Sequence, residues 1–275
     1  MSRSQVSRQL RRDALIIERE AIKQMRPLIR KFHEAVAKPT ADVDLVDSQY
    51  VKAFQEPMKR VLMAANAQAR FRIRSLAPTK EPVQLSVMSD VLAKYRRLNP
   101  AKFEQLDAWY DRLTLQFMTG EAERIERAVR ETVLDNIDKP RSDRQSAVLK
   151  VMQALGVHPD KHHHIATLVR THTQTAYSAG RWTEEQNPEI QEILWGYEYV
   201  DFGDANVRED HQELNGTVLP KEDSFWDQFY PPNGWNCRCV TVPLFSPEPQ
   251  VRKAEVPLEQ QFRVNPGKLL ATVVP

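Results

Sequence analysis

Residues 203–244 limit the possible folds of this chain more than any other stretch does. They contain both cysteines of the sequence, a single histidine, a double proline and the pair Asn215-Gly216. Asn-Gly between short apolar runs is a strong signal for a tight turn between two strands. Alternating runs on either side predict short strands, at residues 193–202, 217–219 and 236–244. A small sheet domain is therefore expected late in the chain.

Most of the remaining sequence indicates amphipathic helix. The first apolar stripe repeats at spacings of three and four, and it consists of Leu10, Ala14, Ile17, Ala21, Met25, Leu28, Phe32 and Val36. This stripe fits a partner surface as well as the core of the chain itself. The fold class is therefore α+β, with a mainly helical, basic N-terminal region at 1–156, a small α+β domain with a few short strands at 157–245, and a proline-containing extended tail at 246–275.

Several single residues predict where helices bend, start or end. Pro27 is expected to kink or divide the first helix, and Gly120 to interrupt a helix in the middle of the chain. Ser142 with Gln145 resembles a capping box before a helix at 143–155. Gly180 is expected to end the helix that precedes the sheet domain.

The net charge of +2 hides two regions of opposite sign. Residues 1–80 hold 17 Lys and Arg against 8 Asp and Glu, a balance of +9. Residues 183–230 hold 2 Lys and Arg against 13 Asp and Glu, a balance of −11. This asymmetry fits two contact surfaces of different chemistry, and it fits two solvated faces equally well.

A predicted helix at 54–73 carries basic residues outside its apolar face. Such a face can lie on phosphates and contribute affinity for nucleic acid that depends on salt and not on sequence. Base stacking is not indicated, because Phe71 alone lies among the basic residues. The candidate phosphate contacts are Lys59, Arg60, Arg70, Arg72 and Arg74.

Composition and segment patterns exclude several classes of protein. Two cysteines that lie two residues apart do not make a disulfide framework, which favours a reducing compartment. The basic start of the chain is not followed by the apolar segment of a signal peptide. No apolar run approaches the ~20 residues of a membrane span. A soluble protein of the cytoplasm, without membrane contact, is expected.

His211, Cys237 and Cys239 are candidate metal ligands. On a strand, both cysteines would project to the same side, and zinc binds thiolates and imidazoles in tetrahedral geometry. The set lacks a fourth ligand, which His172 or Asp204 would supply. In the alternative, the thiols pack as small buried hydrophobes and His211 bonds nearby acidic or backbone groups. Zinc is thus the one cofactor that the sequence suggests.

Other chemistry has less support in the sequence. His162, His163 and His164 point apart at adjacent helical positions, so we expect them on the surface and not around a metal. No complete set of nucleophile, base and orienting group is visible, and the chain is not expected to be an enzyme.

The remaining special residues favour a structural role. Arg170 and Arg181 are expected to pair with Asp201, Asp204 or Asp210 through charge-assisted hydrogen bonds. The tryptophans that flank the double proline are expected to be packing anchors, Trp226 and Trp235. The whole structural constellation consists of Arg170, Arg181, Asp204, Arg208, His211, Trp226, Pro232, Gly234, Cys237 and Cys239.

Many of these residues also carry a family resemblance. Between Lys161 and Leu244 the chain resembles the phage Mu F-like head morphogenesis family of minor head proteins. The pattern departs from the family at Asn206, where a basic residue is usual, and at His172, where an acidic one is usual. The matching pieces are Arg170-Thr171-His172-Thr173, Ala176-Tyr177, Gly180-Arg181, Asp204, Val207-Arg208, His211, Leu214, Gly216, Phe225-Trp226, Pro231 to Trp235 and Cys237-Arg238-Cys239.

The resemblance implies a minor head (capsid) protein of a tailed bacteriophage. It implies a portal-associated structural component that acts in head morphogenesis and in DNA packaging or ejection. The implied partners are the portal protein, the major capsid or scaffolding protein, and viral double-stranded DNA. The implied location is the virion head interior or portal vertex, with the host cytoplasm during assembly. Two alternatives come from the residues alone: a cytoplasmic zinc- or DNA-binding accessory protein, and a zinc-dependent hydrolase.

Overall fold

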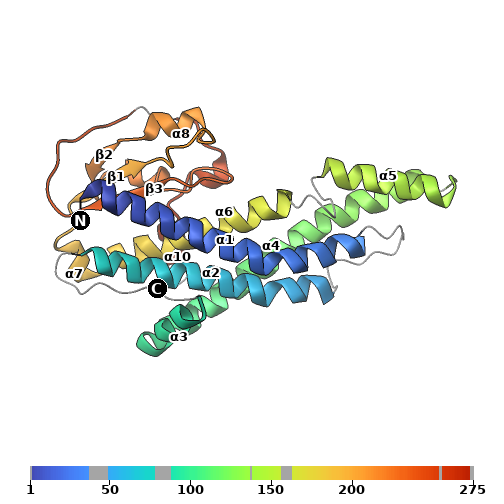
Figure 1. The fold of residues 1–275 in the computed structure, drawn as a ribbon, viewed down its shortest axis with the longest axis horizontal. Coiled ribbons are helices and arrows are strands. Elements are labelled where there is room, and N and C mark those ends of the chain that lie inside the picture. Colours follow the sequence, from blue (N-terminus) through green and yellow to red (C-terminus); the bar gives the residue numbers. More distant parts are fainter. Residues whose placement is uncertain are drawn as a thin grey trace. The chain divides into compact units, whose positions relative to one another are not determined.

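The computed structural model describes residues 2–36, 49–77, 88–136, 138–155, 163–253 and 256–272 (Figure 1). The long helices are α1 Arg3–Val36, α2 Gln49–Leu76, α3 Met88–Leu98, α4 Pro100–Asp135, α5 Arg141–Ala154 and α6 His163–Glu185. The short ones are α7 Pro188–Gln191, α8 Glu209–Leu214, α9 Phe225–Gln228, the 3-10 helix η1 Gln260–Phe262 and α10 Pro266–Ala271. The strands are β1 Gly196–Val200, β2 Val218–Pro220 and β3 Val240–Leu244. This composition confirms the predicted α+β class.

The chain divides into two compact units, each built from separate segments. The first, called the sheet unit below, consists of Met1–Arg19, Val61–Leu106 and Arg170–Pro275. The second, the helical unit, consists of Glu20–Arg60 and Asp107–Val169. Four helices, α1, α2, α4 and α6, have residues in both units. The units therefore follow other bounds than the division at residue 156 drawn from the sequence, which stays a prediction.

The three strands of the sheet unit form an antiparallel sheet in the order β2-β1-β3. The central strand β1 pairs Gly196 with Pro220 on one side and with Leu244 on the other. The turn predicted at Asn215-Gly216 leads into β2, and Gly216 has a positive φ of 78°. β1 is shorter than predicted at both ends, β2 has the predicted length but lies one residue later, and β3 starts four residues after the predicted start.

Aromatic side chains fill the core beside the sheet. Tyr197 of β1 meets Trp226 of α9 and Tyr230 edge to face, with ring centroids 5.3 and 5.7 Å apart. Trp182 of α6 meets Tyr230 at 5.2 Å. Trp226 is fully buried, and its indole Nε1 donates to Pro220 O at 3.0 Å. Trp235 lies nearer the surface, edge-on to Phe262 at 5.3 Å.

The apolar stripe of α1 is buried within this chain. In the sheet unit Leu10, at 0% exposure, packs against Val240 and Val242 of β3. In the helical unit Ala21 and Met25 are also buried. The last two stripe positions have side chains outside the described set. In its described part the stripe thus belongs to the core, and the alternative of a partner surface does not apply there.

Three helix boundaries differ from the prediction. α1 runs through Pro27 and α4 through Gly120 without a break. α5 begins at Arg141 with Pro140 as its N-cap, and no side chain caps it. The capping box was therefore wrong, because Ser142 lies inside the first turn and its hydroxyl donates to Asp143 Oδ1.

α6 continues beyond Gly180 to Glu185, so the predicted end at this glycine was wrong. Gly180 instead permits a close approach between α6 and α2 within the sheet unit. A Cβ atom at Gly180 would lie 2.3 Å from the backbone oxygen of Asn66. The side chain of Asn66 donates to Ala176 O at 3.2 Å in the same place. Glycine is needed here for packing and not for a cap.

The C-terminal segment is folded onto its own chain and is not an extended tail. Val256 and Leu258 are buried in the same aromatic core as Trp182 and Tyr197. The amide side chain of Asn265 donates to Trp226 O at 3.0 Å, and its oxygen accepts from the first backbone amides of α10. Among the described residues, no helix has the length and apolarity that crossing a membrane requires.

Candidate metal centre

The three candidate ligands come from two elements of the sheet unit. His211 lies on α8, and Asp210 Oδ1 accepts from its backbone amide at 2.9 Å. Cys237 and Cys239 lie just before β3, which starts at Val240 and not at the predicted residue 236. The chain turns there, since Cys237 N bonds Gly234 O and Asn236 has a φ of 56°. The local turn, and not strand alternation, thus brings both sulfurs to one side.

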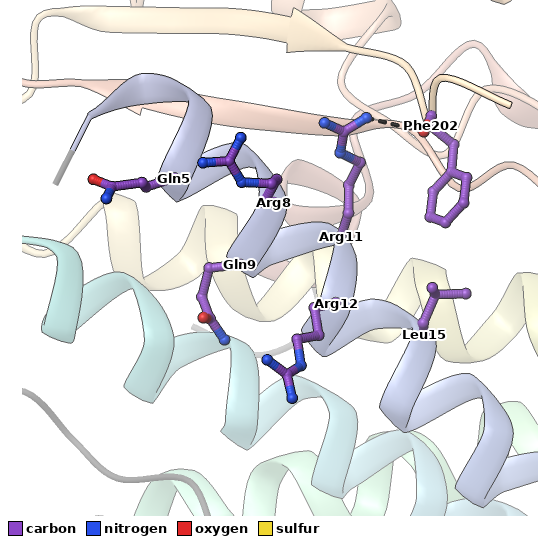
Figure 2. Close-up of a pocket in the computed structure, with 7 residues that line it drawn as sticks. All are labelled: Gln5, Arg8, Gln9, Arg11, Arg12, Leu15 and Phe202. Atoms are coloured by element: carbon purple, nitrogen blue, oxygen red, sulfur yellow. Dashed lines mark hydrogen bonds between the residues drawn. The ribbon is translucent and has the colours of Figure 1, made fainter.

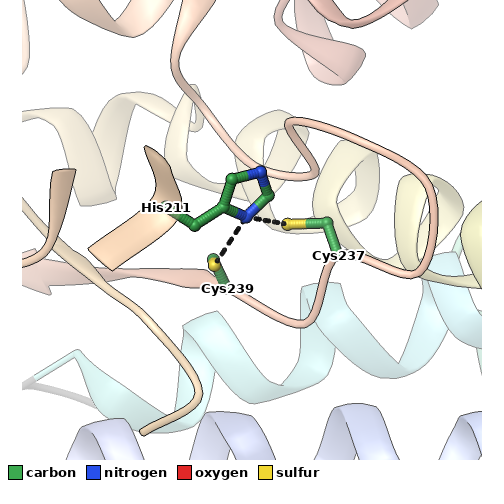
Figure 3. A group of neighbouring side chains, drawn as sticks. All are labelled: His211, Cys237 and Cys239. Atoms are coloured by element: carbon green, nitrogen blue, oxygen red, sulfur yellow. Dashed lines mark hydrogen bonds between the residues drawn. The ribbon is translucent and has the colours of Figure 1, made fainter. Parts of the chain in front are cut away.

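The ligand atoms converge on one nitrogen (Figure 3). His211 Nδ1 lies 3.6 Å from Cys237 Sγ and 3.4 Å from Cys239 Sγ. All three residues are buried, and their ligand atoms lie within 4.8 Å of one another. Both cysteines are free thiols. Three of the predicted ligand residues are therefore brought together.

The other ring nitrogen of His211 contacts Arg208. Arg208 Nη2 lies 3.0 Å from His211 Nε2, and Arg208 Nη1 donates to Trp235 O at 2.9 Å. A guanidinium has donors and no acceptor. His211 Nε2 therefore accepts, and the ring proton sits on Nδ1, where it faces the two sulfurs. Gly234 makes room for this contact, because a Cβ there would lie 2.2 Å from Arg208 Nη2.

The pKa values of the two thiols are shifted in opposite directions. Burial raises the pKa of Cys237, but its hydrogen bonds with Cys239 and His211 outweigh burial and hold this pKa well below the usual range. The hydrogen bond with Cys237, followed by burial, raises the pKa of Cys239 well above the usual range. The pair therefore carries one thiolate, centred on Cys237 and stabilised by the Nδ1 proton.

A small cavity adjoins the cluster. It has a volume of about 20 Å³ and is lined by the three ligands together with Phe202, Asn206, Val207, Arg208, Asn236 and Arg238. About 10–15 Å³ on this measure is enough for one water molecule. The cluster can thus admit one small ligand beside its own atoms.

Neither residue proposed as the fourth ligand joins the cluster. Asp204 is committed to Arg238 through two hydrogen bonds of 2.7 and 2.8 Å, and this partner lowers the Asp204 pKa. His172 lies on α6 outside the group of three, and burial lowers its pKa to about 4. Of the histidine triplet, residue 162 lies outside the described residues and the side chains of 163 and 164 are not described.

The predicted partners of Arg170 and Arg181 were wrong. Arg170 pairs with Glu18 of α1 at 2.9 Å. Arg181 is 1% exposed, lies 3.4 Å from Glu185 Oε1 and donates to the backbone and hydroxyl oxygens of Thr241. Tyr230 OH donates to Glu185 Oε2 at 2.8 Å. The spacing of four residues between Arg181 and Glu185 on one helix was the sequence signal for this buried network.

Four of the five candidate phosphate contacts on α2 are occupied inside the chain. In the helical unit Lys59 pairs with Glu56, Asp107 and Asp111 at 2.8 to 3.4 Å. In the sheet unit the partners are Asn66 for Arg70, Asp13 for Arg72 and Glu184 for Arg74. Arg60 is exposed. Most of the candidate phosphate contacts are therefore engaged within the chain, by carboxylates of α1, α2, α4 and α6 and by an amide of α2 itself.

Comparison with known proteins agrees with the resemblance. Residues 120–242 match the family described as Phage Mu protein F like protein. The resemblance of this segment to the Mu F-like family is thereby confirmed. The match includes α6, β1, β2, the first part of β3 up to residue 242, and all three candidate metal ligands.

Two curated relatives align with the chain over 75 residues. "Putative capsid assembly protein F" of Escherichia phage Mu is 41% identical over this stretch, which is 27% of this chain and 17% of the relative. "Mu-like prophage FluMu F protein" of Haemophilus influenzae is 35% identical, again over 27% of this chain and over 18% of the relative. The matched stretch thus spans less than a fifth of either relative. No solved structure matches the chain.

Proposed function

We propose that this protein is a minor head protein of a tailed bacteriophage, a portal-associated structural component that acts in head morphogenesis and in DNA packaging or ejection. The observation that carries the proposal is the match of residues 120–242 to the Mu F-like family. The name of the phage Mu relative, "Putative capsid assembly protein F", supports the assembly role. Contacts with the portal protein and with the major capsid or scaffolding protein follow from such a role.

A groove along the first half of α1 is the docking surface we propose for the portal protein (Figure 2). It has a volume of about 610 Å³ and is lined by Gln5, Arg8, Gln9, Arg11, Arg12, Leu15 and Phe202. Arg11 is committed to the backbone oxygens of Asp201 and Phe202 at 3.0 and 2.9 Å. Arg8 and Arg12 are exposed and give the groove a positive rim. An acidic segment of the partner fits this chemistry, since complementary charge steers and orients association.

Contact with viral DNA is the second part of the proposal. The exposed cations for it lie on α1, at Arg8, Arg12 and Arg19, because those of α2 are mostly paired. Phosphate contacts of this kind give an affinity that falls steeply with salt. They would hold the protein near the DNA without any preference for sequence.

Co-expression with the portal protein of the same phage, followed by sizing chromatography, tests the docking. We expect one complex for the unaltered chain and loss of the complex in Arg8→Ala/Arg12→Ala. The matched control, Arg60→Ala/Arg97→Ala, removes the same charge from exposed positions outside the groove and should keep the complex. If the unaltered chain elutes alone at every salt concentration, portal docking is wrong. If both double variants bind equally well, the groove is the wrong surface.

The DNA contact is tested separately with a labelled duplex over a series of salt concentrations. The proposal expects weak binding that falls steeply with salt and weakens further in Arg8→Ala/Arg12→Ala. Strong DNA binding without portal docking would favour the accessory-protein alternative.

A further inference from the structure

We propose that His211 Nδ1, Cys237 Sγ and Cys239 Sγ bind a zinc ion, with a water molecule from the adjoining cavity as the fourth ligand. This inference goes beyond the head-assembly role and does not depend on it. Its basis is the geometry of three ligand atoms from two elements of the sheet unit. The ion would fasten α8 to the segment that precedes β3.

The spacing of the ligand atoms is the first argument. Zinc binds thiolate sulfur at ≈ 2.3 Å and imidazole nitrogen at ≈ 2.0–2.1 Å in a tetrahedron, which puts sulfur and nitrogen about 3.6 Å apart. The observed Nδ1–Sγ distances are 3.6 and 3.4 Å. The two nitrogen–sulfur distances in the metal-free cluster are therefore already close to those expected around a tetrahedral zinc ion.

Charge is the second argument. The cluster is buried, and a buried uncompensated charge is costly. Zinc with two thiolates, a neutral imidazole and water has no net charge. The bound ion would therefore leave no uncompensated charge in the interior, and its ligand chemistry suits the two sulfurs.

The cavity supplies the open position. Three protein ligands leave one corner of the tetrahedron for solvent, and about 20 Å³ beside the sulfurs accommodates a single water. Asp204 does not reach this corner as a ligand, because Arg238 holds both of its carboxylate oxygens.

The hydrogen bond of Arg208 to His211 competes with metal binding. Coordination through Nδ1 requires the ring proton to sit on Nε2, where Arg208 now donates a hydrogen bond at 3.0 Å. Arg208 must therefore withdraw when the metal binds. It can do so because its side chain is 46% exposed and has Asp210 at 3.8 Å as another partner. Arg208 thus stabilises the metal-free tautomer.

The test uses the full-length chain purified under reducing conditions. Metal analysis after incubation with zinc and removal of the excess should find about one zinc per chain. Replacement by cobalt should give the near-ultraviolet absorption of thiolate-to-cobalt charge transfer. Cys237→Ser, Cys239→Ser and His211→Asn should each lose the metal, while the matched control Asp204→Asn should keep it. Circular dichroism checks that each variant is folded.

The outcomes separate the proposal from its rivals. An unaltered chain that holds no zinc and gives no cobalt–thiolate absorption would overturn the proposal without any variant. Retention of metal by folded Cys237→Ser/Cys239→Ser would also overturn it, and loss of metal in folded Asp204→Asn would show a different ligand set. Arg208→Ala should bind zinc roughly tenfold more tightly, in line with the effects of residues that orient metal ligands. Weaker binding in Arg208→Ala would contradict its role as a competitor.

Discussion

Two buried polar clusters of the sheet unit differ in how their charges are compensated. In the first, the Arg181–Glu185 network, the cation, the carboxylate and the hydroxyls of Tyr230 and Thr241 bond one another. Its one exception is Arg181 Nε, which has no hydrogen-bond partner among the described residues. In the second, the His211–Cys237–Cys239 cluster, a thiolate faces a ring proton beside a cavity.

This difference indicates a structural role for the Arg181–Glu185 network and a ligand-binding role for the His211–Cys237–Cys239 cluster. Arg181 and Glu185 are almost fully buried and neutralise each other within the chain. The cysteine cluster keeps its charge, has room for one more atom and lies next to a half-exposed arginine. We therefore expect changes in the Arg181–Glu185 network to alter stability, and changes around the cysteine cluster to alter metal affinity.

The largest effect is expected for Arg181→Met. It leaves the Glu185 carboxylate buried without its cation, and burial already raises the pKa of Glu185 above its usual value. The free energy of unfolding should fall by about 3–5 kcal/mol in urea titrations. Arg181→Met/Glu185→Leu removes both charges and should recover part of this loss. If the double variant is less stable than the single one, the network is not held by charge compensation.

A smaller effect is expected from pH through His172, which belongs to neither cluster. Burial lowers its pKa from 6.5 to about 4, so it is neutral in the folded chain where the unfolded chain binds a proton. Stability should therefore be fully present above pH 6.5, fall as the pH drops towards about 4, and level off below. The total loss should be roughly 3 kcal/mol. His172→Gln should remove this component, as measured by urea titrations at several pH values; an unchanged pH slope would contradict the cause.

A matched pair of glycine substitutions sharpens the comparison. In Gly180→Ala the new Cβ would meet the backbone of Asn66 at 2.3 Å, next to Arg181. Backbone cannot yield easily, so stability should fall by about 1–3 kcal/mol. Zinc affinity should not change, because α6 contributes no ligand. A change in zinc affinity with unchanged stability would reverse the assignment of the two clusters.

Gly234→Ala should have the smallest effect on stability. Its Cβ would meet the mobile end of Arg208 at 2.2 Å, and that exposed side chain can move away. We expect a change of at most about 0.5 kcal/mol in the free energy of unfolding. Zinc should bind more tightly, as in Arg208→Ala, because the competing hydrogen bond is lost. Competition with a coloured chelator measures this affinity, and weaker binding would contradict the account.

The fold class and the clustering of His211, Cys237 and Cys239 could be predicted from the sequence, while a fourth ligand and the neighbours of the cluster could not. Turn residues and apolar spacing indicated the strands and the helices, and two cysteines near one histidine indicated the cluster. The two sulfurs do not converge through strand alternation. They converge because the chain turns after Gly234 and Asn236 adopts a left-handed backbone conformation. Such a turn depends on packing that a single sequence does not reveal.

Tertiary contacts account for the other differences. Gly180 was interpreted as a helix end because glycine often follows helices, but it lies where two helices meet. Arg72 and Arg74 of α2 were interpreted as possible phosphate contacts, but they pair with Asp13 of α1 and Glu184 of α6. The segment after residue 245 lacked periodicity, yet Val256, Leu258 and Asn265 attach it to the core.

The most direct test of the central claim is an X-ray absorption spectrum at the zinc edge of the full-length chain. The account predicts that the nearest atoms are two sulfurs at about 2.3 Å and two nitrogen or oxygen atoms at about 2.0 Å. The Cys239→Ser chain should show at most one sulfur if any metal remains. A spectrum of the unaltered chain without sulfur neighbours, or with four, would contradict a site made of His211, Cys237, Cys239 and water.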